Sequence, residues 1–148
     1  MEKVFSRLKL QVVKEEGKEY SSTGPMDNPE AVYRKCISME MDKEPEEVML
    51  LFTLDMKLYP TGCFEVSRGN LNSCLVHPRE IFKRAILQNS ARIILVHNHP
   101  SGDIFPSDED KKVTGIIKRC GEILCIPLVD HIIVGDNEFF SFKEREIL

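Results

Sequence analysis

The sequence predicts an α/β protein of the α+β type, with a mixed central sheet flanked by helices. Three observations favour this class. Val48–Leu54 is an almost wholly apolar run, and Arg92–Val96 is apolar and rich in β-branched residues, so both are expected to be buried strands. Pro78–Leu87 carries apolar residues at helical spacing, and a second helical pattern follows Ser107. Strands and helices therefore share one chain of 148 residues, a length typical of one domain.

The N-terminal part predicts a strand, a loop and a helix in that order. Val4–Val13 alternates apolar and polar side chains, which favours a half-exposed strand. Lys14–Met26 is polar and contains Gly and Ser, so we expect a loop or an interaction segment. Asn28 followed by Pro29 is typical of an N-cap and a first helical residue, and we expect that helix to run towards Met39.

The remaining elements follow from apolar runs separated by turn residues. We expect residues 1–45 to pack on the same domain as residues 46–148, with a break at Asp42–Pro45 between them. The further expected elements are a turn at Asp55–Lys57, a short strand at Cys63–Val66, a connecting loop at Gly69–Leu75, and a hairpin in which Leu128–Val134 and Glu138–Phe142 flank Gly135–Asn137.

Composition and charge indicate an ordinary globular protein and give no sign of nucleic-acid binding. The chain is 42% hydrophobic and 30% charged, with 20 Lys and Arg against 24 Asp and Glu. Proteins that track phosphates usually have a basic excess or patch, and a formal net charge of −4 offers none. The net charge therefore does not support DNA as a partner, although DNA remains possible.

The five cysteines and the absence of an apolar start predict a cytoplasmic protein without a membrane span. An odd number of cysteines without regular spacing favours reduced thiols; they are Cys36, Cys63, Cys74, Cys120 and Cys125. No basic start leads into an apolar run, and no apolar stretch approaches the roughly 18 residues of a spanning helix.

The strongest functional signal is a pair of histidines at the end of the second buried strand. His97 and His99 are two residues apart, and in an extended chain such side chains point to the same side. Pro100 and Gly102 then interrupt the strand. Two imidazoles placed in this way can converge on one metal ion.

A third ligand follows at the start of the next helix. Asp110 falls in the first turn after Ser107, so its carboxylate can complete a set of two nitrogens and one oxygen. Three protein ligands leave one coordination position for water, as in catalytic zinc sites. Ser107 and Asp110 also resemble a helix-capping pair, and capping does not exclude a role for Ser107 at the metal.

This pattern resembles a known family. His97-x-His99, seven residues, Ser107, two residues and Asp110 is similar to the JAMM motif of JAB/MPN-domain metallopeptidases. The string from His97 to Asp103, with Pro106-Ser107, resembles the RadC-like branch, as do the flanking strings Val76–Ile81 and Asp130–Gly135. The resemblance covers roughly Glu46 to Phe142. About 45 residues precede Glu46, and we expect them to be too few for the helix-hairpin-helix region of longer RadC-like proteins plus a linker.

The resemblance implies a JAB/MPN-like (cytidine-deaminase-like) fold, one zinc ion and peptidase or isopeptidase chemistry. His97, His99 and Asp110 would bind the zinc, and Ser107 would stabilise the oxyanion. A general base is also required, and Glu47 at the start of the first buried strand is the preferred position. The residues leave Glu46, Glu65 and Glu80 open as alternatives.

The other polar residues near these strings are expected to have structural roles. They are His77, His131, Asn98 and Asp103.

Two functions remain open at the level of the sequence. The first is a zinc-dependent hydrolase that cleaves a peptide or isopeptide bond, in a family that carries a DNA-repair label. The second is a metal-stabilised module that binds a protein or DNA partner without catalysis. The segment Val4–Val13 could also act as an added edge strand in a homodimer.

Overall fold

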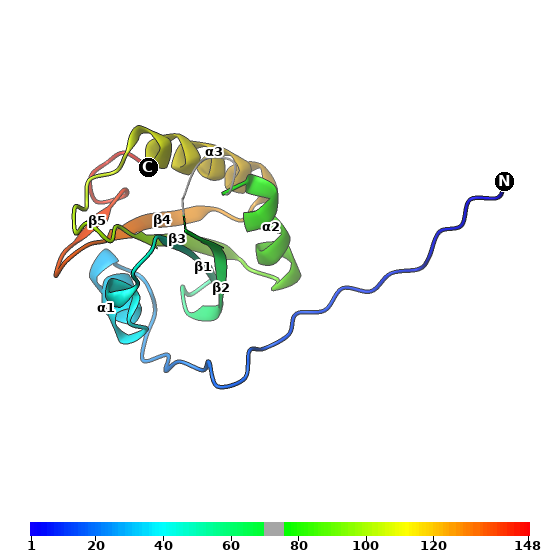
Figure 1. Ribbon diagram of the computed structural model, residues 1–148, viewed down its shortest axis with the longest axis horizontal. Coiled ribbons are helices and arrows are strands. Elements are labelled where there is room, and N and C mark those ends of the chain that lie inside the picture. Colours follow the sequence, from blue (N-terminus) through cyan, green and yellow to red (C-terminus); the bar gives the residue numbers. More distant parts are fainter. Residues whose placement is uncertain (70–75) are drawn as a thin grey trace.

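A computed structural model of the chain describes residues 1–69 and 76–148, and its centre is a five-stranded sheet (Figure 1). The strand order is β2-β1-β3-β4-β5. The strands are β1 (Val48–Leu54), β2 (Pro60–Arg68), β3 (Arg92–Asn98), β4 (Leu128–Val134) and β5 (Phe139–Ser141). Strand β1 pairs antiparallel with β2 and β3, β3 pairs parallel with β4, and β4 pairs antiparallel with β5. The predicted mixed sheet is confirmed.

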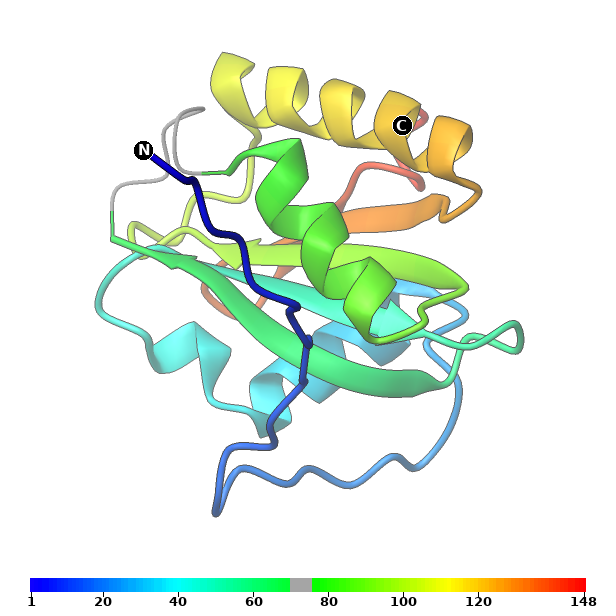
Figure 2. The same cartoon turned by 90° about the vertical axis from the view of Figure 1, so that its right-hand side faces the viewer.

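Helices cover both faces of this sheet. They are α1 (Pro29–Ser38), α2 (Pro78–Leu87) and α3 (Asp108–Leu124), with a single 3-10 turn at Met41–Lys43. Helix α1 lies on one face, and α2 and α3 lie on the other (Figures 1 and 2). The α/β class with a sheet flanked by helices is therefore confirmed, and the architecture is consistent with a JAB/MPN-like fold.

Strand β1 is buried along its whole length because it contributes to both layers of the core. Leu50 and Phe52 pack in the cluster that includes Val32 of α1. Met49 and Leu51 point the other way, into the cluster formed with α2 and α3. A strand covered on both faces needs continuous apolar residues, which explains why its sequence shows no alternation.

Helix α1 begins where its capping residues predicted, and helix α2 begins at the residue where its apolar pattern starts. The Asn28 side chain accepts a hydrogen bond from the N–H of Ala31 at 2.9 Å, and proline occupies the first helical turn of α1. Helix α2 begins at Pro78, after an imidazole cap in which His77 Nδ1 accepts the N–H of Arg79 at 3.2 Å. His77 therefore has the structural role expected of it.

The turns at 55–57 and 135–137 also form as predicted. Asp55 Oδ1 accepts the N–H of Lys57 at 2.8 Å, which tightens the connection between β1 and β2. In the second hairpin the N–H of Gly135 donates to the carbonyl of Glu138 at 2.9 Å, and Asn137 has a φ of 57°.

The strand expected at Val4–Val13 was wrong. These residues form no strand and lie fully in solvent, with Phe5 95% exposed and Leu8 83% exposed. The N-terminal segment extends away from the rest of the chain (Figure 1). Its alternation matches the pattern of a half-buried strand, but no strand among residues 1–69 and 76–148 pairs with it.

Two other expectations need adjustment. Strand β2 is longer than the expected Cys63–Val66 and runs from Pro60 to Arg68. The loop expected at Gly69–Leu75 falls almost wholly on residues 70–75, outside the described part of the chain. Among the described residues, no helix combines the length and apolarity needed to span a bilayer.

Candidate metal centre

Three side chains converge where the carboxyl end of β3 meets the beginning of α3. Single ligand atoms from His97, His99 and Asp110 all lie within 4.8 Å of one another. The two Nε2 atoms of the histidines are 3.0 Å apart. His97 Nε2 lies 3.4 Å from Asp110 Oδ1, and His99 Nε2 lies 3.4 Å from Asp110 Oδ2. The three residues expected as metal ligands are thus brought together.

The sheet determines where the two histidines lie. His97 pairs with Met49 of β1 and with Ile133 of β4, so its backbone is held on both sides, and the side chain is 0% exposed. His99 follows the last residue of β3, and its N–H donates to the carbonyl of Val134 at 2.9 Å. The side chains of His99 and Asp110 are each 13% exposed, so the cluster is open to solvent on the side of these two residues.

The capping box of α3 orients the third residue. Ser107 Oγ accepts the N–H of Asp110 at 3.1 Å, and Asp110 Oδ2 accepts the N–H of Ser107 at 2.8 Å. The carboxylate is therefore held in one orientation by the same helix cap that the sequence suggested. Ser107 itself is exposed at the end of the loop, next to the cluster.

Each histidine also has a partner for its other ring nitrogen. His99 Nδ1 lies 2.6 Å from the backbone carbonyl of Asp103. Because a carbonyl can only accept, Nδ1 of His99 carries a hydrogen, and in the neutral imidazole Nε2 therefore carries a lone pair. His97 Nδ1 lies 2.7 Å from Nε2 of His131, a buried residue on β4.

The electrostatics of the cluster are those of a carboxylate held against imidazoles. Burial alone would raise the pKa of Asp110, but hydrogen bonding to His97 and His99 outweighs it and the pKa falls below its usual range. Hydrogen bonding to Asp110 is the largest of the causes that raise the pKa of His99. His131 differs from both, because complete burial lowers its pKa well below the ordinary value.

Glu47 lies at the edge of the site. It immediately precedes β1, is half-buried, and its charge is one of the smaller causes that raise the pKa of His99. Strand β1 begins beside the end of β3, so Glu47 and His99 lie at the same end of these two strands.

The rival glutamates are committed to ion pairs. Arg68 lies 3.3 Å from Glu46 Oε1 and also pairs with Glu65. Glu80 on α2 pairs with Lys83 at 2.7 Å and with Arg84 at 2.9 Å. Within the described residues, no such ion pair involves Glu47.

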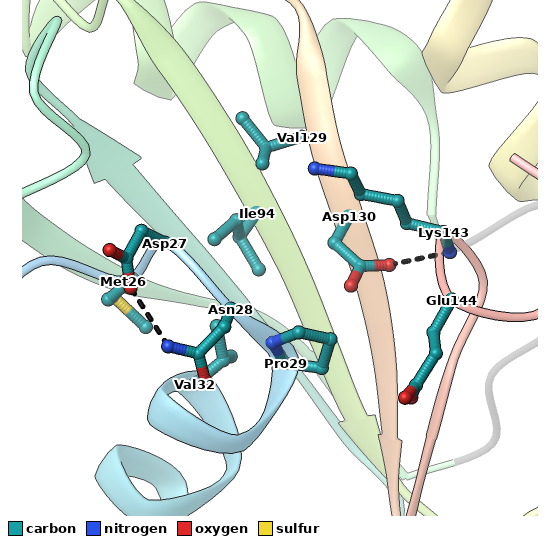
Figure 3. A pocket seen from close by; sticks show the side chains of 10 residues that line it. All are labelled: Met26, Asp27, Asn28, Pro29, Val32, Ile94, Val129, Asp130, Lys143 and Glu144. Carbon is teal, nitrogen blue, oxygen red and sulfur yellow. Dashed lines mark hydrogen bonds between the residues drawn. The ribbon is translucent and has the colours of Figure 1, made fainter.

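A cavity of about 290 Å³ lies elsewhere, on the α1 face of the sheet (Figure 3). Asn28, Pro29 and Ile94 contribute to its wall. The carboxylate of Asp130 also lines it, but that group already accepts hydrogen bonds from the N–H groups of His131 and Lys143 and from the hydroxyl of Ser141; the last of these is 2.6 Å long. This cavity is on the other side of the sheet from the His97 side chain and is not part of the candidate centre.

The sequence predicted a structural role for His131 but did not identify the residues that it contacts. Its Nδ1 lies 2.6 Å from Thr114 Oγ1, and its ring stacks on Phe142 with centroids 4.7 Å apart. The string Asp130-His131 beside a predicted strand was the available signal, but nothing local links it to His97.

A mixed α/β domain with a His-His-Asp cluster at a strand end defines the class as a candidate metalloprotein with a JAB-like architecture. Comparison with known families agrees, because the family described as the RadC-like JAB domain matches residues 26–147. The chain belongs to this family. The match extends beyond Glu46–Phe142, the stretch on which the resemblance was recognised, and includes α1.

Curated relatives carry the name UPF0758 protein. One from Clostridium beijerinckii is 52% identical over 109 residues, which is 74% of this chain and 48% of that protein. One from Clostridium kluyveri is 48% identical over 133 residues, covering 90% of this chain and 56% of the relative. One from Chlorobaculum parvum is 50% identical over 107 residues, covering 72% and 48%. The chain thus spans about half the length of the curated relatives it matches.

Proposed function

We propose that this chain is a metal-dependent hydrolase that uses zinc to cleave peptide or isopeptide bonds. One observation carries the proposal: two imidazole nitrogens and a carboxylate oxygen, each able to bind a metal ion, converge on a single point. The carbonyl of Asp103 fixes the lone pair of neutral His99 on Nε2, which lies 3.0 Å from Nε2 of His97 and 3.4 Å from the carboxylate of Asp110. A positive charge among these atoms, either a metal ion or the proton that Asp110 favours on His99, offsets the repulsion between their lone pairs.

The donor set fits zinc. Two imidazole nitrogens and one carboxylate oxygen are ligands that zinc accepts, and three protein ligands are typical of catalytic rather than structural sites. A bound zinc ion would polarise a substrate carbonyl and activate a water molecule. His97, His99 and Asp110 are the residues that would hold it.

Glu47 is the proposed general base. Its carboxylate would take a proton from the attacking water and deliver it to the leaving nitrogen. Two features support the choice: its charge acts on the His99 imidazole, and the competing residues Glu46, Glu65 and Glu80 are held by basic side chains.

Ser107 is proposed to donate a hydrogen bond to the developing oxyanion. Its Oγ accepts the N–H of Asp110 at the helix cap, which uses a lone pair and leaves the hydroxyl hydrogen available for substrate. A donor of this kind contributes on the order of 3 kcal/mol to transition-state stabilisation.

Metal content tests the site directly. Purified protein should hold about one zinc per chain, in line with a three-ligand site. His97→Ala and Asp110→Ala should both lose it, whereas His77→Asn removes an imidazole but keeps a capping side chain at the start of α2 and should retain it. Full metal retention in both ligand variants would overturn the assignment.

Turnover tests the chemistry. Zinc-loaded protein is incubated with a peptide mixture and with a peptide carrying a lysine isopeptide bond, and products are identified by mass spectrometry. Glu47→Gln should retain zinc and lose about 10²–10⁴-fold in rate. Glu46→Gln, the adjacent control, should stay close to wild type; unchanged activity in Glu47→Gln would place the base elsewhere.

A binding module that holds metal without catalysis is the second candidate. The exposed apolar side chains between Val4 and Val13 favour it, because they are available to a protein partner. This function gains support if zinc binds but neither substrate is cleaved. A salt-dependent mobility shift with labelled DNA would identify a nucleic acid as the partner, and the net charge of −4 argues against that result.

A further inference from the structure

A chain of buried hydrogen bonds leads from His97 into the protein, away from the cluster. His97 Nδ1 lies 2.7 Å from His131 Nε2, and His131 Nδ1 lies 2.6 Å from Thr114 Oγ1. The Thr114 hydroxyl donates to the backbone carbonyl of Asp110 at 2.7 Å. His97 and His131 are 0% exposed and Thr114 is 1% exposed, so these contacts are made without competition from solvent.

The hydrogens in this chain can be assigned one after another. A threonine hydroxyl has one hydrogen, and the carbonyl of Asp110 can only accept it. Thr114 Oγ1 therefore accepts from His131, which puts the hydrogen of that imidazole on Nδ1 and a lone pair on Nε2. The lone pair accepts from His97 Nδ1 in turn.

The opposite direction of the chain is unfavourable. If the Thr114 hydroxyl donated to His131 instead, its oxygen and the carbonyl oxygen of Asp110 would lie 2.7 Å apart without a hydrogen between them. In the assigned direction, each short contact of the chain has one hydrogen. With both imidazoles neutral, the contact between the Nε2 atoms of His97 and His99 has no hydrogen, and this is where the cation of the proposed site belongs.

The packing around His131 keeps its ring in place. The ring lies nearly parallel to Phe142, with an interplanar angle of 8° and centroids 4.7 Å apart. It also lies against the His97 ring with centroids 4.8 Å apart. A ring so enclosed has little freedom to turn, and its two nitrogens stay directed at their partners.

We propose that His131 and Thr114 are positioning residues that select the tautomer and orientation of His97, so that the Nε2 lone pair of His97 faces the metal. The inference rests on the proposed metal centre and deepens it. Metal-binding histidines usually receive this support from a carboxylate or a carbonyl, as His99 does from Asp103. For His97 this support would come from the imidazole of His131 and the hydroxyl of Thr114. Because that hydroxyl also donates a hydrogen bond to the backbone carbonyl of Asp110, the two residues would connect the ligands His97 and Asp110.

Zinc affinity is the first test. Thr114→Val removes the hydroxyl with little change in shape, Thr114→Ser keeps it, and His131→Phe removes both nitrogens while preserving an aromatic ring beside Phe142. Measured by competition with a chromophoric chelator, Thr114→Val and His131→Phe should bind zinc about 10–100-fold more weakly than wild type, and Thr114→Ser should match it. Thr53→Val, which removes a buried hydroxyl on β1, is the control and should not change the affinity.

The tautomers are the second test, and they need no metal. In metal-free protein with ¹⁵N-labelled histidine, at about pH 8, where imidazoles are ordinarily neutral, long-range ¹H–¹⁵N correlation spectra should show His131 protonated on Nδ1. Thr114→Val should lose this preference and Thr114→Ser should keep it. Because Thr114→Val makes a small change, it remains informative if His131→Phe does not fold.

The outcomes separate this inference from the proposed function. Wild-type zinc affinity in both Thr114→Val and His131→Phe, or His131 protonated on Nε2, would overturn the inference. A wild-type chain that binds no zinc would overturn the proposed function and with it the positioning role. Zinc binding without hydrolysis would contradict the proposed activity and leave the inference standing on the affinity and tautomer results.

Discussion

The side-chain oxygen of Asn98 accepts a hydrogen bond from the backbone N–H of Val48 at 2.7 Å. Its amide nitrogen donates to the backbone carbonyl of Glu46 at 3.0 Å. Asn98 is the last residue of β3 and Val48 the first of β1, so one amide joins the two strands at the edge where His97 lies. Glu47 lies between the two backbone groups that Asn98 holds.

Asn98→Ala should therefore destabilise the fold without removing the metal ligands. The variant leaves the buried N–H of Val48 without its partner, which costs about 1–3 kcal/mol in the free energy of unfolding. Urea denaturation of the metal-free protein measures this loss, and metal analysis should show zinc retained. Ser38→Ala removes an exposed hydrogen bond to the carbonyl of Lys35 and should stay within about 0.5 kcal/mol of wild type. A stability equal to wild type in Asn98→Ala would contradict the role given to Asn98.

Gly135→Ala should disturb the loop that supports His99. A Cβ at this position would overlap the Ile104 side chain and lie 2.6 Å from the carbonyl of Gly102, so the loop must move. Since the same loop carries the Asp103 carbonyl that bonds His99, zinc affinity should fall together with thermal stability. Calorimetry and the chelator competition measure the two effects.

The matched control for this prediction is Gly115→Ala in α3. Among the residues that the structure describes, its Cβ would meet only the Arg119 side chain, at 3.8 Å, which is an ordinary contact. Alanine in a helix interior should stabilise the protein by about 0.5–1 kcal/mol and leave zinc affinity unchanged. Equal effects of the two substitutions would argue against a specific role for the Gly135 contact.

Removal of residues 1–13 should leave the stability of the fold unchanged. The large apolar side chains of this segment are exposed, and the first core residue along the chain is Met26, whose N–H donates to the carbonyl of Leu58 at 2.8 Å. The free energy of unfolding, measured by urea denaturation, should change by less than about 0.5 kcal/mol. A larger loss would indicate that the segment packs on the sheet in solution. Sedimentation of both forms would show in addition whether it joins two copies.

Acid should weaken the ion pairs at the start of α2. Hydrogen bonds from Lys83, and then from Arg84, lower the pKa of Glu80 to about 2. The folded pKa lies below the unfolded value of about 4.3, so the stabilisation is complete above that value and is lost as the pH falls towards about 2. The difference in unfolding free energy between wild type and Glu80→Gln should therefore shrink from about pH 6 to about pH 2. High salt at neutral pH should also reduce it, and a difference that grows in acid would contradict the prediction.

Local patterns were sufficient to predict several elements of the fold and the pair of histidines. Helix α2 and strand β4 have the expected bounds. The signals that define them, apolar spacing and a proline or glycine at the boundary, are all local in the sequence. His97 and His99 were predictable as neighbours for the same reason, since period-two geometry alone puts them on one side of an extended chain.

Features that depend on distant partners were not predictable in this way. Val4–Val13 has the alternation of a strand, but alternation cannot say whether another strand is present to pair with it. The contact between His97 and His131 joins positions 34 residues apart and depends on the parallel pairing of β3 with β4. The choice of Glu47 over Glu46 as general base likewise depends on the ion pair between Glu46 and Arg68, the last residue of β2.

The three candidate ligands come from one short stretch, His97 to Asp110, whereas His131 joins them from β4. A chain that has lost its sheet therefore still carries the three chelating groups close together along the sequence. A metal that binds the unfolded as well as the native chain raises the melting temperature by less than its native affinity alone implies. The shortfall would measure how much of the affinity belongs to the bare peptide, and the remainder is what Thr114, His131 and the folded loop add to it.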